Sequence, residues 1–162
     1  MDDGFKFLEA DGDSTEADYA YTGKGGTCDS KKETTASGLK KAKITSYSDV
    51  TPKSCTQMMA AVAKGPVSVA IEADQTGFQH YSTGVFSGTC GTSLDHGVLV
   101  VGYGTDGSSE YWKVKNSWGT TWGDAGYIRM TKSCASTGRQ LLGGKTKAGE
   151  CGILSQPSYP VV

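Results

Sequence analysis

The sequence predicts an α+β fold in which short strands form an antiparallel sheet. Two observations lead to this prediction. One clearly signalled helix, between Ser54 and Gly65, is followed by four strand-like segments that end near residue 131. The chain also has 23 glycines among 162 residues, about twice the usual share of roughly 7%. Tight turns between short strands account for that usage, and such an element order is typical of α+β domains.

Composition excludes several classes of partner. Lys+Arg number 16 and Asp+Glu 17, and the basic residues near position 40 include no arginine and no interleaved aromatics, so we expect no nucleic-acid partner. No apolar run approaches the ~18 residues of a membrane span, so we expect no membrane segment. The opening "MDDGFKFLEA" is acidic and does not resemble a secretory signal. With two histidines and no Cys-x-x-Cys pair, no metal site is expected.

The first 50 residues predict an incomplete unit. Residues 1–10 form an expected short helix with Met1, Phe5 and Leu8 on one side, ended by Gly12. Residues 11–50 are rich in turn formers and predict an irregular segment with one or two short strands. They contain too few periodic apolar positions for a core of their own.

Residues 51–162 predict a sheet domain. Its helix should begin at Ser54 as N-cap, with Gln57 as capping-box partner, and end at Gly65-Pro66. Segment 66–73 alternates apolar and polar residues, as a half-buried strand does. Segment 96–104 is almost continuously apolar, which predicts a strand covered on both faces. Strands over 111–118 and 126–131 complete the set, and 133–150 is expected to be a surface loop.

Strand parity singles out Asn116, the only asparagine of the chain. It shares a face with Trp112 and Val114, where an unpaired amide would cost about 1–3 kcal/mol. His96, at the start of another strand, is a candidate partner, since an asparagine carbonyl would fix the imidazole tautomer. Trp118 could shield that hydrogen bond from water. On parity alone, a structural histidine and an ordinary aromatic core are the commoner interpretations.

Several motifs resemble the second half of papain-like cysteine proteases of cathepsin L type. They are "LDHGVLVVGYG", "YWKVKNSWGTTWGDAGYIRM" and the closing "CGILSQPSYPVV", with further matches in "GPVSVAI", "TEADYAYTG" and "MDDGF". The resemblance follows one order from end to end of the chain. It implies a papain-like fold, mainly the antiparallel, barrel-like right domain over 51–162, preceded over 1–50 by the tail of the helical left domain.

The resemblance also implies a role for individual residues. His96 corresponds to the general base and acid, Asn116 to the residue that orients it, and Trp118 to the tryptophan that covers the pair. Four residues fall on positions that line the pocket for the substrate side chain two places before the cut: Ala70, Leu94, Gln156 and Met1, the last of which is equally explained as a start-codon artefact.

The nucleophile of the family lies in a Gly-Ser-Cys-Trp motif that this sequence lacks, and the oxyanion glutamine is absent with it. None of the five cysteines has the required neighbours: Cys28, Cys55, Cys90, Cys134 and Cys151. The chain is therefore interpreted as a fragment of a cysteine endopeptidase that is inactive alone and whose N-terminal part is its missing partner.

Cysteine positions imply disulfides in the same way. Cys90 and Cys151 fall on a pair that bridges the second domain in the family. Cys28 falls on a cysteine whose partner lies in the absent upstream part. Cys55 and Cys134 have no counterpart, and the sequence leaves open whether they bridge one another or stay reduced.

Two other interpretations remain open from the sequence. The chain could be a non-catalytic relative that binds or scaffolds, or a member with serine as nucleophile, as in sponge silica-forming relatives. The expected partners are peptide or protein substrates, and cystatin-like inhibitors or a propeptide; no cofactor is expected. The resemblance and the cysteine usage together imply a lysosomal or extracellular location.

Overall fold

The computed structural model describes residues 1–29, 32, 43–132, 134 and 147–162. Most of the loop expected at 133–150 therefore lies outside the described residues. The chain forms two compact units: Met1–Ser48 with Pro160–Val162, and Asp49–Tyr159. The expected boundary was at residue 50, with everything after it in one domain. The last residues instead join the first unit, because Thr45 N–H donates to the Val161 carbonyl at 2.8 Å.

The first unit is built on helix α1, Asp2–Ala10, which ends as expected just before Gly12. Gly12 has a φ of 80°, a conformation that glycine adopts without strain. Phe5 is the buried residue of α1, and its ring stacks on Tyr47 with centroids 5.5 Å apart. Met1 was expected on the same apolar side but is 44% exposed.

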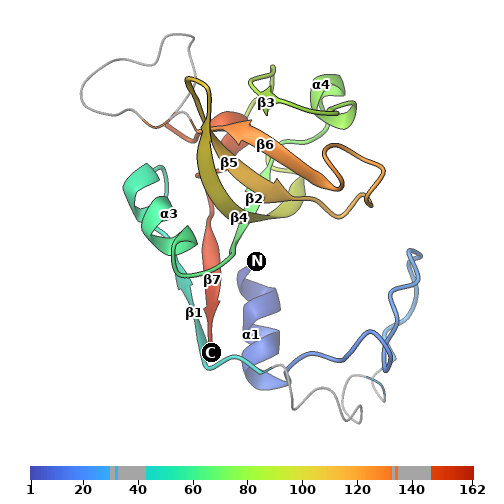
Figure 1. Cartoon of the computed structure of the whole chain (residues 1–162). Helices are drawn as coiled ribbons and strands as arrows, with labels where there is room; N and C mark the ends of the chain where they lie inside the picture. The colour runs from blue at the N-terminus through green and yellow to red at the C-terminus, as the bar shows by residue number, and fades with distance from the viewer. Residues whose placement is uncertain (30–31, 33–42, 133, 135–146) are drawn as a thin grey trace. The chain divides into compact units, whose positions relative to one another are not determined.

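The sheet has seven strands in the hydrogen-bonded order β1-β7-β2-β4-β5-β6-β3 (Figure 1). Their bounds are β1 Ser46–Asp49, β2 Val67–Ile71, β3 Val85–Phe86, β4 His96–Asp106, β5 Ser109–Lys115, β6 Tyr127–Thr131 and β7 Ser158–Val161. The middle strands β2, β4, β5 and β6 are the four that the sequence predicts, and they pair antiparallel throughout.

Two of the remaining three strands differ from the prediction. β1 lies in the segment expected to hold one or two short strands, whereas β3 and β7 were not expected. β3 has only two residues and pairs parallel with β6 through Val85 and Phe86. A two-residue strand has no alternation to detect, so its existence depends on a tertiary partner.

The prediction that β4 is covered on both faces is wrong. Val98 and Val100 are buried, whereas Gly97 and Tyr103 are exposed, so the strand alternates as in a sheet with one solvated face. The register shifts between Val100 and Gly102. In β5 the predicted parity holds, since Trp112 and Val114 are buried and Lys113 is exposed.

Helix α3, Cys55–Val62, lies beside the sheet (Figure 1). Ser54 is its N-cap, and its hydroxyl accepts the N–H of Gln57 at 3.3 Å, as predicted. The helix ends at Val62, before the expected stop at Gly65. Two short elements were not predicted: α4, Thr76–Gln79, and a 3₁₀ turn, Glu150–Gly152. Both are too short to show helical periodicity.

One core cluster fills the second unit. Among its fully buried side chains are Trp112, Phe78, Met58, Ile71, Ile128, Met130 and Ile153. They come from α3, α4, the central strands and the segment that follows the 3₁₀ turn. No helix in the described part of the chain is long and apolar enough to cross a membrane.

Two disulfides bridge distant parts of the second unit. Cys90 joins Cys151, and Cys55 joins Cys134 across 79 residues of sequence. The second bond answers the question that the sequence left open. Cys28, in the first unit, is exposed and has no disulfide partner.

We expect the double substitution Cys55→Ser/Cys134→Ser to lower the free energy of unfolding by about 2–4 kcal/mol, because it releases a long loop in the unfolded chain. Chemical denaturation measures this loss. Cys28→Ser is the matched control, since it removes a sulfur that bridges nothing in the described structure, and it should leave stability unchanged. An equal loss in both variants would contradict the prediction.

Candidate active site

The sheet places His96 and Asn116 on neighbouring strands. His96 is the first residue of β4, and Asn116 directly follows β5. These two strands pair antiparallel, with Leu99 opposite Lys115. On its other side His96 pairs with Ile71 of β2. Two residues 20 positions apart therefore meet at one end of the sheet.

A hydrogen bond joins the two side chains, with His96 Nε2 2.8 Å from Asn116 Oδ1. The same oxygen accepts the backbone N–H of Ser117 at 2.7 Å. A carbonyl oxygen accepts and never donates, so Nε2 is the nitrogen that carries a hydrogen. In the neutral imidazole the lone pair is then on Nδ1, which is the nitrogen that can take up a proton.

Asn116 is held rigidly. It is 8% exposed, and its backbone N–H donates to the Gly126 carbonyl at 3.0 Å. Its Nδ2 is buried without a hydrogen-bond partner among the described residues. An unsatisfied buried donor costs about 1–3 kcal/mol. The two hydrogen bonds that Asn116 Oδ1 accepts, from His96 and from Ser117, offset that cost.

Trp118 covers the His96–Asn116 pair on one side. Its ring lies 5.1 Å from the His96 ring, between centroids, at an interplanar angle of 31°. Phe78 and Trp122 meet the Trp118 ring edge-on at 5.7 and 5.2 Å, and the Trp122 indole N–H donates to the Gln79 carbonyl at 2.9 Å. An aromatic cluster thus holds Trp118 in place while 38% of that residue stays exposed.

Sequence reasoning missed the supporting role of α4. Phe78 and Gln79 of α4 contact the two tryptophans, although nothing in "TGFQ" predicts a helix or a link to His96. The available signal was only that Phe78 is a large apolar residue among polar ones. The contact arises from packing between segments about 40 residues apart.

The four predicted pocket residues are distributed over both units. Ala70 lies in β2, half-buried, and pairs with Gly97, the neighbour of His96. Leu94 is half-buried and lies against Gly152, where a Cβ would come within 2.7 Å of Leu94 Cδ2. Gln156 is exposed. Met1 belongs to the first unit, at the start of α1.

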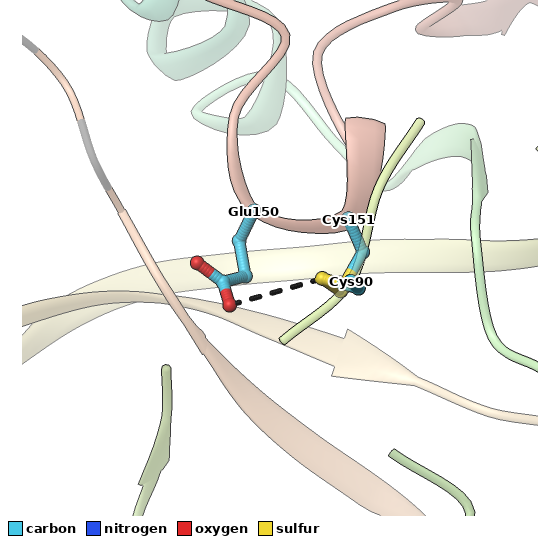
Figure 2. Close-up of side chains that lie close together, drawn as sticks. All are labelled: Cys90, Glu150 and Cys151. Atoms are coloured by element: carbon cyan, nitrogen blue, oxygen red, sulfur yellow. Dashed lines mark hydrogen bonds between the residues drawn. A yellow bond between two sulfur atoms is a disulfide. The ribbon is translucent and has the colours of Figure 1, made fainter. Parts of the chain in front are cut away.

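Cys90, Cys151 and Glu150 form the one group of potential metal-binding side chains in the described part of the chain (Figure 2). The two sulfurs are joined in a disulfide, so neither is a thiolate that could bind a metal. Cys90 Sγ lies 3.9 Å from Glu150 Oε1, but a disulfide sulfur has no hydrogen to donate. The group is therefore a disulfide packed against a buried carboxylate.

The disulfides also exclude the cysteines of the second unit as nucleophiles. All four cysteines of the second unit are in disulfides. None of them can supply a thiolate to His96. Cys28 is the one cysteine with no disulfide, and it belongs to the first unit.

The structure thus places a histidine against a buried asparagine and beside a tryptophan, at one end of an antiparallel sheet. The chain belongs to the papain family, since the profile described as "Papain family cysteine protease" matches residues 1–161. It is 44% identical over 162 residues to Cysteine proteinase RD21A of Arabidopsis thaliana and 46% identical over 164 residues to Vignain of Ricinus communis. Each alignment covers 99% of this chain, but 32% and 41% of those relatives.

Solved structures agree with the papain-like fold. Bromelain from Ananas comosus, solved in complex with the E64 inhibitor, gives a TM-score of 0.81 at 41% identity, covering 98% of this chain and 67% of that one. The proform of the ragweed pollen allergen Amb a 11 gives 0.85 at 36% identity, covering 100% and 46%. The chain thus spans less than half the length of the curated relatives cited here. Those relatives are plant proteinases, and they do not specify the cathepsin L type.

We expect Asn116→Ala to abolish the slowly exchanging Nε2 proton of His96 in the NMR spectrum, because the acceptor is gone. The free energy of unfolding should fall by about 1–3 kcal/mol. His80, the other histidine, is exposed at the C-terminal end of α4, where its ring contacts the Thr76 carbonyl, and is the internal control. A persistent His96 Nε2 signal in the variant would contradict the assigned geometry.

Proposed function

We propose that the chain supplies the general base and its orienting residue to a cysteine-type endopeptidase. The observation that carries this proposal is the hydrogen bond from His96 to Asn116 beneath Trp118. Peptide hydrolysis by acyl transfer requires a nucleophile, a base and a group that orients the base. This chain has the second and third of these in hydrogen-bonding geometry.

In the proposed reaction a thiolate, paired with the His96 imidazolium, attacks the substrate carbonyl. His96 then donates its Nδ1 proton to the leaving amine, and water releases the acyl-enzyme with His96 as base. Asn116 keeps the imidazole oriented through Nε2 in both steps. The thiolate has to come from outside the second unit's four bonded cysteines, and we infer that it comes from a segment with the family's Gly-Ser-Cys-Trp motif.

The proposed substrates are peptides, and the proposed regulators are a propeptide or a cystatin-like inhibitor. The solved relatives include a proform and a complex with the E64 inhibitor, which supports binding of a propeptide and of an inhibitor. We further propose a lysosomal or extracellular location, because two disulfides are typical of an oxidising compartment.

The chain by itself should not hydrolyse peptides and should not be labelled by an epoxide thiol inhibitor, because the four cysteines in the unit that contains His96 are bonded in disulfides. Joined to a segment carrying the family's nucleophile motif, it should become active. His96→Ala should then lower kcat by at least about 10³-fold, measured with a fluorogenic peptide. His80→Ala is the matched control and should retain activity. Inhibitor-sensitive hydrolysis by the unmodified chain would refute this assignment.

Ala70 and Leu94 should favour apolar or aromatic substrate side chains two places before the cut, because this lining is uncharged. Profiling the active form with a peptide library measures the preference. Ala70→Glu should shift it towards basic side chains, since a carboxylate would then face that side chain. A preference of the unsubstituted protein for acidic or strongly basic residues would show that the pocket is assigned wrongly.

A further inference from the structure

Glu72 is a buried carboxylate that the proposed reaction does not use. It directly follows β2 and is 7% exposed. One oxygen accepts the N–H of Gly91 and the other the N–H of Ser93, each at 2.6 Å. Burying a charge is costly unless hydrogen bonds or an opposite charge compensate it, and no ion pair reaches Glu72 within the described ranges. These two short backbone bonds, together with a longer one from Gln75 Nε2 to Oε1 at 3.4 Å, are its stabilising partners.

Glu72 and Gly91 fit together closely. A Cβ at position 91 would come within 2.7 Å of Glu72 Oε2, so the carboxylate lies directly against the backbone there. The backbone N–H of Glu72 donates to the Cys151 carbonyl at 2.9 Å, and Cys151 is bonded to Cys90. The Glu72 carboxylate thus joins the end of β2 to residues 91 and 93, before β4, and the Glu72 backbone N–H joins it to Cys151, the disulfide partner of Cys90.

The residues around His96 are held to the end of β2 by hydrogen bonds that do not involve the Glu72 carboxylate. Asp95 N–H donates to the Ile71 carbonyl at 3.0 Å, and Asp95 Oδ1 accepts the Ala73 N–H at 2.8 Å. His96 itself pairs with Ile71 in the sheet. Leu94 lies between the two sets of bonds, so its position depends on Glu72 on one side and on Asp95 on the other.

We propose that Glu72 is a positioning residue that sets the location of Leu94, and through it the binding of the substrate side chain, without taking part in placing His96. This rests on the proposed function, in which Leu94 lines the pocket. A carboxylate is needed because it accepts two donors, one on each oxygen. A glutamine has only one acceptor oxygen, and its NH₂ would face the remaining backbone N–H.

Glu72→Gln tests the attachment directly. In the ¹⁵N,¹³C-labelled protein we expect amide exchange at Gly91 and Ser93 to become at least about tenfold faster, with a shift of the Leu94 methyl signals and an unchanged Nε2 proton of His96. Glu110→Gln is the matched control, because Glu110 pairs with Lys132 at 3.3 Å and, in the described part of the chain, makes no hydrogen bond or ion pair with residues 91–95. Unchanged exchange at Gly91 and Ser93, or a His96 signal that moves with them, overturns the proposal.

A measurement on the unsubstituted protein tests the hydrogen bonds from Gly91 and Ser93 to Glu72, even if Glu72→Gln does not fold. Scalar couplings across the hydrogen bonds should connect the amide nitrogens of Gly91 and Ser93 to the carboxyl carbon of Glu72. If these couplings are absent, Glu72 does not accept these hydrogen bonds and the proposal is overturned.

Steady-state kinetics of an active form tests whether Glu72 affects substrate binding. Glu72→Gln should raise KM about tenfold and leave kcat within twofold, since the catalytic pair is held elsewhere. A fall in kcat at constant KM overturns the role. If no form containing the chain hydrolyses peptides, the substrate role is overturned together with the proposed function, whereas the NMR measurements decide the attachment independently.

Discussion

The antiparallel pairing of β2, β4 and β5 is the constraint on which the rest of the site depends. It brings the start of β4 beside the end of β5, so that the side chains of His96 and Asn116 meet at one end of the sheet. A slip of one residue in this register would turn Asn116 away from the core face and break the pair. The buried valines on both strands oppose such a slip, because they would be exposed by it. Packing of the core thus holds His96 next to Asn116 at the end of the sheet.

Around this pair the structure adds two kinds of support. On one side an aromatic cluster, with Phe78 at its centre, holds Trp118 over the hydrogen bond. On the other, backbone hydrogen bonds and a disulfide hold the segment that leads into β4. Both supports come from short, irregular segments rather than from long elements. The rigid sheet therefore carries the reacting group, and the loops on it carry the groups that shape its surroundings.

The disulfides divide the cysteines by role. Cys90–Cys151 and Cys55–Cys134 each tie a connecting segment to the sheet domain, which leaves no thiolate in that domain. The chain spans 32% and 41% of the length of the two curated relatives. The chemistry proposed for the whole protein therefore depends on a second segment, while the orientation of the base is already complete within this one.

The sequence by itself determined the α+β class, the four central strands, the Ser54 cap and the parity of Asn116, because each of these follows from local periodicity or a local hydrogen bond. Its motifs also identified His96, Asn116 and Trp118 as one group. Only the tertiary structure decided that β4 has one solvated face, that Cys55 bonds Cys134, that Phe78 packs against Trp118, and that Glu72 accepts the N–H groups of Gly91 and Ser93. These features join residues up to 79 positions apart, and such contacts depend on how the sheet pairs and packs, which no local pattern records.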